Sequence, residues 1–537
     1  MPIDLRAPII SISASLERKS RVIVWDGCHP PHGRLCEPID TFFHRRATEP
    51  VSNTKMQLQR TALAALRHSG IADASIPRRT LSHSPSLQCN AVADKIKDVW
   101  IEQFSSSVLG KGKGVQGLRP LNDVCRQTLP SLRVPTPRDE EYRFTDLSAL
   151  TRTSLYTAEG ASDADVSEFV AGRGLDAEAV RVVVVDGVVR SVEGPVPPAA
   201  YVGGVEGAPE DILRFSLGSQ SKSRGGPFAA LNGAAVRDCT VVYVPENCTF
   251  TAPIHIINVS TSSEARSSAE NGATAFSAPR LLAFLEAGST ATIIEEFVSL
   301  PGTGGAHASF SVTEIELDDR ASLEHKYVEL DGDKAVTLKS TLVSQGKEST
   351  YSLTEVRLGG ELSRHDVGIV QLGERTHTEM RHFLLAGEGQ THDLHTKLLL
   401  DHPEGTADQV HKCIAVAESS KGVFDGNVRV NKMAQRTDAG QLSRNLLLAP
   451  RATVNVKPNL QIVADDVKCT HGCAVSDLEA EQLFYLQTRG IDPSSARKML
   501  VYSFGGEVTQ KLNDKRLVER VTAATTRALD AAFNRQV

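Results

Sequence analysis

The spacing of hydrophobic and polar residues changes several times along the chain. Apolar residues at helical spacing predict a helix over Ala91–Phe104. The region that follows is mixed, and its one evident strand is Val182–Val185, which precedes an Asp-Gly turn. Serine, glycine and basic residues dominate Ser216–Pro227, which predicts an exposed loop there.

Many short strands are predicted from about Val241 to Val463, separated by turns that contain glycine or aspartate. A weak repeat of two small or β-branched residues and an aliphatic one follows several of these turns, as in Ala291–Ile293, Ala321–Leu323 and Ala452–Val454. Short strands with such a repeat indicate a β-solenoid or a β-sandwich. Aromatic residues make up only 5% of the chain, which suits stacked rungs with an aliphatic core.

The helical period returns after Val475. Ser476 and Glu479 form a capping-box pattern, which predicts a helix start at this point. Asp492-Pro493 predicts the start of a second helix, which we expect to end at Gly505-Gly506. The apolar stripe of the remaining tail fits either the protein's own core or a docking face for a partner.

These patterns divide the chain into residues 1–90, a mixed helical region 91–235, a β core 236–474 and a helical domain 475–537. The first segment is rich in serine and holds 12 Lys and Arg against 7 Asp and Glu. Basic, serine-rich segments are typical of organelle transit peptides. A disordered extension or an imperfect gene model remains the alternative for this segment.

Composition and charge exclude several classes of protein. The net charge of −6 argues against a nucleic-acid partner. No apolar run reaches about 18 residues, so we expect no membrane span. The nine cysteines are scattered and odd in number, which indicates a reducing compartment. The Gly- and Lys-rich stretch 108–114 does not match a phosphate-binding loop, so we expect no ATP site, and no hydrolase motif is found.

Candidate chemistry is concentrated in one short run. Cys469, His471 and Cys473 lie within five residues, directly after Asp465 and Asp466. Thiolates and imidazole are the ligands that iron, copper and zinc prefer. The spacing is not that of a closed zinc site, which needs four protein ligands. A bound metal would therefore need ligands from elsewhere, and the alternative is a half-buried cysteine and a hydrogen-bonded histidine at a strand end.

Six further histidines lie within 35 residues of one another: His377, His382, His392, His395, His402 and His411. We interpret most of them as surface or rung-stacking residues. On a strand, His392 and His395 point to opposite faces, whereas Cys413 shares a face with His411.

The run Ala464–Ile491 resembles the C-terminal signature of the SufD family, subunits of the SUF iron–sulfur cluster assembly scaffold. Cys469 favours SufD over the sister SufB family, in which an acidic residue stands at that position. Cys473 departs from the SufD pattern, which usually has alanine there. The resemblance covers roughly residues 120–510 and also includes Pro135–Leu147, Pro227–Asn232, Phe424–Asn427, Ala434–Gln441 and Asn445–Leu448.

This resemblance implies a mainly β fold with a right-handed parallel β-helix core, flanked by an N-terminal mixed region and a C-terminal helical domain. It implies a non-catalytic scaffold subunit in the chloroplast stroma. The implied partners are a SufB-like subunit and a SufC-like ABC ATPase, which would dock on the C-terminal helices.

The implied cargo is a transient iron–sulfur cluster at a subunit interface. His471 is the first candidate ligand and Cys469 the second, shared with the partner. Four neighbours are assigned to support of the surrounding loop: Asp465, Asp466, Lys468 and Gly472.

Two other functions stay open. A carbohydrate-active β-helix enzyme would need a cluster of acidic residues on one face. The nearest candidates, Asp318-Asp319 and Asp331 with Asp333, are expected in turns. The third possibility is a purely structural partner in which Cys469 and His471 do no chemistry.

Overall fold

The computed structural model describes residues 98–109, 115–158, 162–262, 273–301 and 306–533. The expected transit segment 1–90 and the first part of the helix expected over Ala91–Phe104 lie outside these residues. The described helix there is α2 (Val99–Ser107), which Asp98 caps by accepting the N–H groups of Trp100 and Ile101.

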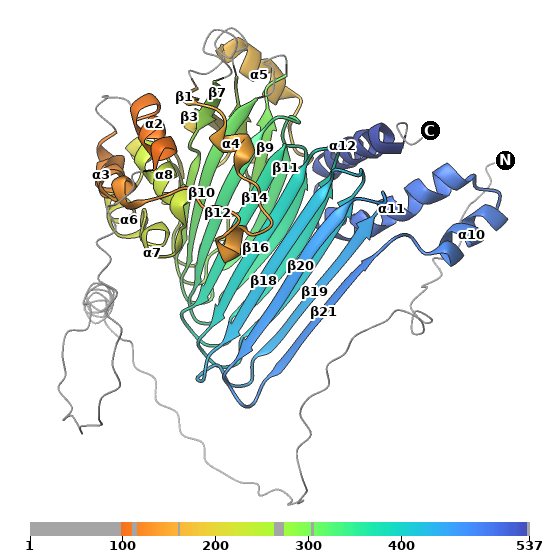
Figure 1. The fold of residues 1–537 in the computed structure, drawn as a ribbon. Helices are drawn as coiled ribbons and strands as arrows, with labels where there is room; N and C mark the ends of the chain where they lie inside the picture. Colours follow the sequence, from red (N-terminus) through yellow and green to blue (C-terminus); the bar gives the residue numbers. More distant parts are fainter. Residues whose placement is uncertain (1–97, 110–114, 159–161, 263–272, 302–305, 534–537) are drawn as a thin grey trace, which may run out of the picture. The chain divides into compact units, whose positions relative to one another are not determined.

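The described chain is mainly β, and its core is a β-solenoid of about seven turns, as expected (Figure 1). Two sheets of mostly parallel strands form its two walls, and from β8 to β21 successive strands alternate between them. Among the described residues, sheet A has 11 strands: β1 (Leu155–Thr157), β4 (Tyr201–Gly203), β5 (Thr240–Val244), β7 (Thr274–Ser277), β8 (Arg280–Leu285), β10 (His307–Leu317), β12 (Val336–Gln345), β14 (Leu362–Gln371), β16 (Thr391–Leu400), β18 (Lys421–Val430) and β20 (Thr453–Ile462).

Sheet B forms the opposite wall and has ten strands among the described residues. They are β2 (Val180–Val185), β3 (Val188–Glu193), β6 (Ile254–Ser260), β9 (Thr290–Ser299), β11 (Ser322–Leu330), β13 (Thr350–Leu358), β15 (His377–Ala386), β17 (Thr406–Ala415), β19 (Asp438–Leu447) and β21 (Lys468–Ser476).

One corner of the solenoid repeats the same backbone conformation on successive rungs. The chain turns from sheet A to sheet B at a residue with φ between 55° and 61°, a left-handed conformation that suits a tight turn. The backbone N–H of each of these residues donates to a carbonyl of the next rung, as Glu348 does to Glu374 at 2.8 Å. The residues are Asn247, Arg320, Glu348, Arg375, Glu404 and Arg436.

Helices cover both walls. The outer face of sheet A packs against N-terminal helices around Trp100, Phe104 and Phe310. These helices are α2, α3 (Arg119–Thr128), α4 (Ser148–Thr151), α6 (Glu210–Ser216), α7 (Ser221–Arg224) and α8 (Pro227–Ala235). Helix α5 (Asp163–Ala171) instead packs through Val166 and Val170 on strands β2, β6 and β9 of sheet B. The outer face of sheet B packs against the C-terminal helices α11 (Pro493–Thr509) and α12 (Lys515–Phe533), which follow α10 (Ala480–Thr488). None of the described helices is long and apolar enough to cross a membrane.

The exposed loop expected over Ser216–Pro227 is wrong. This stretch forms the end of α6, all of α7 and the start of α8, and Ser216, Gln220 and Ser221 are buried. Its polar groups solvate a buried ion pair between Arg280 and Glu314, whose atoms lie 2.5 Å apart. The Glu314 carboxylate accepts the backbone N–H groups of Gln220 and Ser221, which is why a polar stretch is buried here.

Two expected helix ends also differ. Strand β21 continues to Ser476, so Ser476 caps no helix, and the capping box expected there is wrong. Helix α11 begins as expected, because Asp492 accepts the N–H of Ser495 at 3.0 Å. It does not stop at Gly505-Gly506 but continues to Thr509. Gly505 is buried against the ring of Phe383, so this glycine permits close packing instead of ending the helix.

Candidate functional site

The candidate run lies at one end of the solenoid. Asp465 and Asp466 occupy the turn after β20, and Lys468 begins β21, the last strand of sheet B. Among the described strands, β21 pairs along one edge, with β19, so its other edge has no strand neighbour. Lys468 and Gly472, expected in a supporting loop, are therefore strand residues.

The strand places the three candidate ligands on one face. Cys469, His471 and Cys473 pair in register with Ala439, Gln441 and Ser443 of β19, three residues whose side chains are buried inside the solenoid. Paired residues on parallel strands point to the same side, so the three ligands face the continuation of the interior. Cys469 is half-buried, whereas His471 and Cys473 are exposed. The end rung thus presents two thiols and an imidazole at the open mouth of the solenoid.

Both thiols hold their protons more tightly than a free cysteine does. Partial burial raises the pKa of Cys469, and the charge of Asp438 raises it further. Partial burial also raises the pKa of Cys473. A metal ion must therefore displace a proton from either thiol before it binds as a thiolate ligand.

The turn before β21 is held by backbone contacts. The N–H of Asp466 donates to the side-chain oxygen of Gln435 at 2.9 Å, and the carbonyl of Asp466 accepts the N–H of Arg436 at 2.6 Å. The N–H of Lys468 donates to the carbonyl of Thr437 at 2.8 Å. Asp465 is exposed to solvent.

The candidate ligands do not close a metal site among the described residues. In the part of the chain that the structure describes, no three His, Cys, Asp or Glu side chains lie close enough together to hold a metal ion. An iron–sulfur cluster takes several thiolate or imidazole ligands, which is more than this run supplies.

The histidines between residues 377 and 411 lie mostly inside the protein. His382, His392 and His411 are fully buried in the solenoid, and His395 is buried on the outer face of sheet A, so the surface interpretation is wrong for these four. The stacking interpretation is confirmed for His382 and His411, which are paired in register. His392 and His395 do lie on opposite faces of β16. Of the remaining two, His377 is exposed and His402 is half-buried.

Cys413 shares the inward face of β17 with His411, as expected, and both are fully buried. Burial raises the pKa of the Cys413 thiol to about 12. This thiol is therefore a core residue and not a metal ligand in the fold described.

The sequence interpretation missed the charged interior. Glu355 and Arg357 on β13 and His365 on β14 are fully buried inside the solenoid. For Glu355 and Arg357 the signal was available, because they continue an alternation of inward residues that begins with Tyr351 and Leu353 on the same strand.

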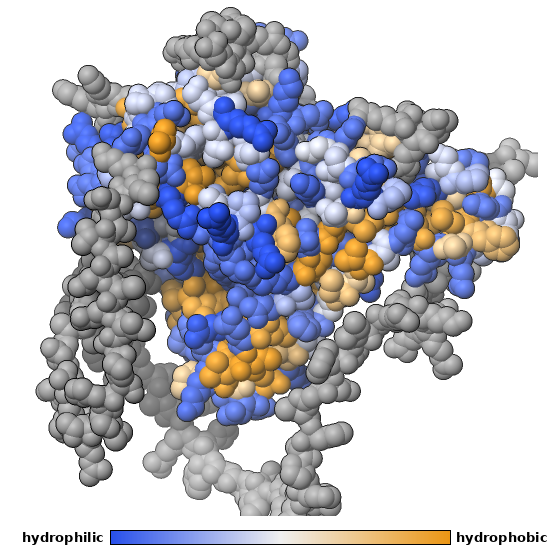
Figure 2. Space-filling model, in the orientation of Figure 1, coloured by the Kyte–Doolittle hydropathy of each residue, from blue (hydrophilic) through white to orange (hydrophobic). Residues whose placement is uncertain are grey.

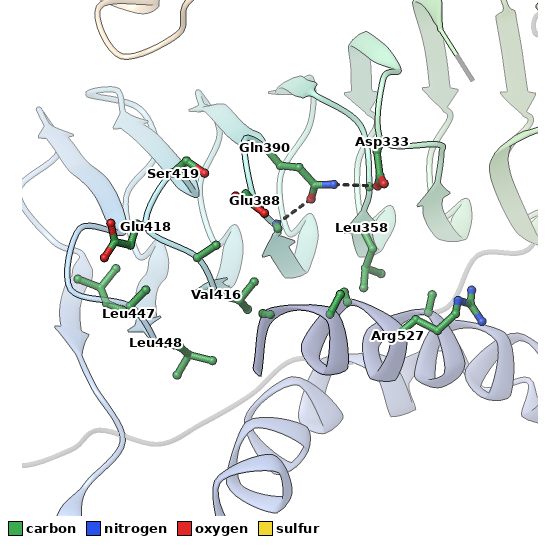
Figure 3. Close-up of a pocket in the computed structure, with 18 of the residues that line it drawn as sticks. Asp333, Leu358, Glu388, Gln390, Val416, Glu418, Ser419, Leu447, Leu448 and Arg527 are labelled. Carbon is green, nitrogen blue, oxygen red and sulfur yellow. Dashed lines mark hydrogen bonds between the residues drawn. The ribbon is translucent and has the colours of Figure 1, made fainter. Parts of the chain in front are cut away.

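A groove elsewhere on the protein lacks the candidate chemistry. It lies between α12 and the corner where sheet B turns into sheet A, and contains Val416, Leu447 and Leu448 (Figure 3). Gln390 lines the groove. Its side chain donates to Asp333 at 3.3 Å and accepts the backbone N–H of Gly387 at 2.7 Å. Its lining residues include no cysteine or histidine, so the groove is not a site for a soft metal.

Comparison with known proteins assigns the family. Residues 266–504 match the family model for the SUF system FeS cluster assembly SufBD core domain. The chloroplastic protein ABCI7 of Arabidopsis thaliana is 39% identical over 82% of this chain and 92% of its own length. The chain belongs to the SufBD family.

Other SufBD relatives agree with this assignment. An iron–sulfur cluster assembly SufBD family protein of Synechocystis is 34% identical over 72% of this chain and 85% of its own length. The iron–sulfur cluster assembly protein SufD of Escherichia coli is 32% identical over 44% of this chain and 56% of its own length. The SufD resemblance inferred from the sequence is thus confirmed, and the chloroplastic relative confirms the plastid location.

Proposed function

We propose that this SufBD-family chain is a non-catalytic scaffold subunit that pairs with a SufB-like subunit through the open end of its solenoid. A nascent iron–sulfur cluster is its cargo, held between His471 and Cys469 of this chain and ligands of the partner. A SufC-like ATPase docks on the C-terminal helices and supplies the motion that opens the interface. The proteins of this family are scaffold-type subunits, which supports the non-catalytic assignment.

One observation carries the proposal: the candidate ligands alternate along β21, which has no neighbour on one edge among the described strands. An unpaired edge exposes a row of backbone donors and acceptors that a second sheet can extend. The ligands face the mouth of the solenoid, where a partner's end rung would meet them. Their number is too small to keep a finished cluster, which suits a site that must release its product.

The apolar residues at this end support the interface. Ile462 is 46% exposed, Val463 53% and Val475 44%, and all three belong to the last rung or its turn. In the body of the solenoid, the corresponding residues Val430 and Asn445 are buried. A partner that continues the solenoid would remove this apolar surface from water.

The ATPase docking site is supported by helix α10. It has no buried residues of its own, and Phe484 and Tyr485 are 67% and 57% exposed. Figure 2 shows apolar side chains on the lobe that α10 forms at the right of the molecule. An exposed aromatic pair on a protruding helix is suited to a partner's groove.

The sharpest test of docking substitutes surface residues, because truncation of the C-terminal helices would uncover the outer face of sheet B. We expect Phe484→Ser to abolish capture of the ATPase subunit in a pull-down. Phe215→Ser is the matched control, since Phe215 is 51% exposed on α6. Equal ATPase capture by both variants would place the docking site elsewhere.

The test of the cluster site uses anaerobic reconstitution with iron and sulfide, followed by visible absorption. We expect the isolated chain to hold no stoichiometric cluster and its complex with a SufB-like subunit to hold one. His471→Ala should remove that cluster, whereas Thr470→Ala, on the outward face of the same strand, should keep it. A stable cluster on the isolated chain, or full loading of the His471→Ala complex, would contradict the proposal.

A further inference from the structure

The interior of the solenoid contains columns of aligned side chains, one residue per rung. On sheet B, one column runs through Leu353, Met380, Gln409 and Gln441 and ends at His471. Consecutive members lie on neighbouring strands, about 4.8 Å apart. His471 is therefore the exposed last member of a column whose two preceding members are buried glutamines.

The glutamines connect to a buried carboxylate in the adjacent column. Glu355 lies 2.5 Å from the guanidinium of Arg357, 3.0 Å from Nδ1 of His365 and 2.7 Å from Nδ1 of His382. Burial opposes ionisation of Glu355, but His365 and Arg357 outweigh it and hold its pKa well below the usual range. The ionised carboxylate only accepts hydrogen bonds, so His382 must donate to it from Nδ1.

The Glu355 carboxylate fixes the donor and acceptor of each following hydrogen bond, from His382 through Gln409 to Gln441. Nε2 of His382 lies 3.2 Å from the amide nitrogen of Gln409, a group that only donates, so Nε2 accepts and carries no proton. Oε1 of Gln409 in turn accepts from the amide nitrogen of Gln441 at 2.9 Å. The side-chain oxygen of Gln441 is then the last acceptor in this series of hydrogen bonds. It is buried and has no hydrogen-bond partner among the described residues.

The surrounding packing holds the Gln441 amide in this orientation. A Cβ atom at Gly426 would lie 2.3 Å from Nε2 of Gln441, so glycine at 426 provides the space that the amide fills. A buried acceptor without a partner destabilises the fold, because its hydrogen bond to water is lost and not replaced. The next residue of its column is His471, and either ring nitrogen of a neutral imidazole is able to donate.

We infer that Gln441 is a positioning residue for His471: its free side-chain oxygen accepts the imidazole N–H and leaves the other ring nitrogen unprotonated toward the open end. This inference rests on the proposed role of His471 as a ligand. A hydrogen bond on one nitrogen selects the tautomer and the ring orientation of a metal-binding histidine. It also explains two of the segments that resemble the SufD family. Gly426 lies in Phe424–Asn427 and leaves room for the amide of Gln441, which lies in Ala434–Gln441.

The test measures the His471 tautomer directly, by ¹⁵N NMR of the full chain with labelled histidine, alone and bound to the SufB-like subunit. Gln441→Met keeps the size but removes the acceptor, so we expect the single tautomer of the wild type to become a mixture. Gln409→Met does not touch His471 but frees the Gln441 amide to rotate, and should give a smaller change in the same direction. Gln441→Glu retains an acceptor and should restore one tautomer.

The matched control is Gln345→Met. Gln345 is also buried inside the solenoid, and its side chain makes two hydrogen bonds, to His377 and Thr378, on rungs distant from β21. Its substitution should leave the His471 tautomer unchanged. An unchanged tautomer in Gln441→Met, or an equal change in all three methionine variants, would overturn the inference and leave Gln441 as packing alone.

A second measurement separates this inference from the proposed function. In the complex, Co²⁺ alone serves as the probe, and loss of a residue that orients a ligand is expected to weaken its binding about 10- to 100-fold. Suppose that Gln441→Met changes the His471 tautomer, but neither Gln441→Met nor His471→Ala changes the affinity for Co²⁺. The metal role of His471 would then be refuted, and the positioning contact would stand. Weak Co²⁺ binding in His471→Ala together with a normal His471 tautomer in Gln441→Met would support the metal role and refute the positioning contact.

Discussion

The two ends of the solenoid are completed in different ways (Figure 1). At the first end, β3 pairs antiparallel with β2 in sheet B and β4 with β5 in sheet A, where the short strand β1 also pairs in parallel with β7. β4 has only three residues, and the β2–β3 pair has a register shift between Val183 and Val184. Short and irregular edges resist further pairing. At the second end, β20 and β21 are regular strands of ten and nine residues with nothing beyond them among the described strands.

The difference indicates which end another molecule completes. The first end closes the sheets within the chain, whereas the second exposes regular strand edges together with Cys469, His471 and Cys473. A site built on such an edge is assembled when a partner arrives and is dismantled when it leaves. The predictions below test this distinction by comparing substitutions at the open end with substitutions elsewhere.

The largest effect is expected in the middle of the solenoid. Glu355→Ala leaves Arg357 as a buried cation without its partner, which costs about 3–5 kcal/mol of unfolding free energy. His471→Ala, on the end rung of the same sheet, should change stability by less than about 0.5 kcal/mol because the side chain is exposed. Chemical denaturation of both variants measures the contrast. Similar losses in the two would mean that the end rung is as tightly packed as the middle.

A pH effect of about 3 kcal/mol is expected from Glu329. Burial and the charge of Asp331 raise the pKa of this carboxyl from 4.5 to about 7, although Tyr327 and Ser363 donate hydrogen bonds to it. Between these pH values the folded protein holds more protons than the unfolded chain. Its stability therefore falls as the pH rises from about 4.5 to about 7, by about 1.4 kcal/mol per unit of pKa shift.

Glu329→Gln removes this titration, so the variant should gain stability relative to the wild type as the pH rises through 7. Denaturation at pH 5 and pH 8 gives the comparison, with the difference between the two proteins cancelling the other titrating groups. A constant difference between them would show that Glu329 has an ordinary pKa.

The open end itself is tested by a charge on its inward face. Val475→Lys places an ammonium where we propose that a partner's rung packs, and we expect at least about a hundredfold weaker complex, which is about 2.7 kcal/mol. Val192→Lys is the matched control, because Val192 is 37% exposed on β3 at the closed end. Size-exclusion chromatography with the SufB-like subunit reads the result. Equal complex formation by the two variants would remove the distinction between the ends.

The ligands should contribute unequally. We expect His471→Ala to impair cluster assembly at least about tenfold, Cys469→Ser less and Cys473→Ala least. The order follows the SufD pattern, which Cys473 departs from, and the half-buried position of Cys469 beside the core. Complementation of a strain that lacks its own SufD measures it, with the complex checked by size-exclusion chromatography. Cys473→Ala as the most damaging substitution would assign the leading ligand role to that thiol.

Much of the fold followed from local patterns, because a β-solenoid is built from short strands and tight turns. The number of residues per rung was not predictable, since from β9 to β21 successive strands of sheet B start 27 to 32 residues apart. The weak repeat reflects this irregularity: Leu323 pairs with Ala291, so the Ala291–Ile293 and Ala321–Leu323 segments are displaced by two residues.

The candidate site was found from residue chemistry, but its setting was not. Cys469 and His471 attracted attention because thiol and imidazole are metal ligands, and they lie together on one strand face. Gln441 lies next to His471 on the neighbouring strand, and Glu355 lies further inside the solenoid. These positions depend on the pairing of strands that are distant in sequence. A polar residue is predicted to be exposed unless its buried partner is known. Gln220 is buried because its N–H donates to Glu314, and His411 is buried because it stacks on Phe424.

The smallest effect concerns two adjacent glycines in the helix that covers sheet B. A Cβ atom at Gly505 would lie 2.6 Å from the Phe383 ring, whereas one at Gly506 would meet no described atom within 4 Å outside its own stretch of helix. Alanine favours a helix by about 1 kcal/mol over glycine at either position. Crowding at 505 costs about 1–3 kcal/mol, so we expect Gly505→Ala to destabilise by about 1 kcal/mol and Gly506→Ala to stabilise by up to about 1 kcal/mol. Thermal unfolding of the pair gives the signs, and two stabilising alanines would mean that α11 does not pack closely on β15. Because both sites lie on the covered wall and not at the open end, neither variant should change binding of the SufB-like subunit.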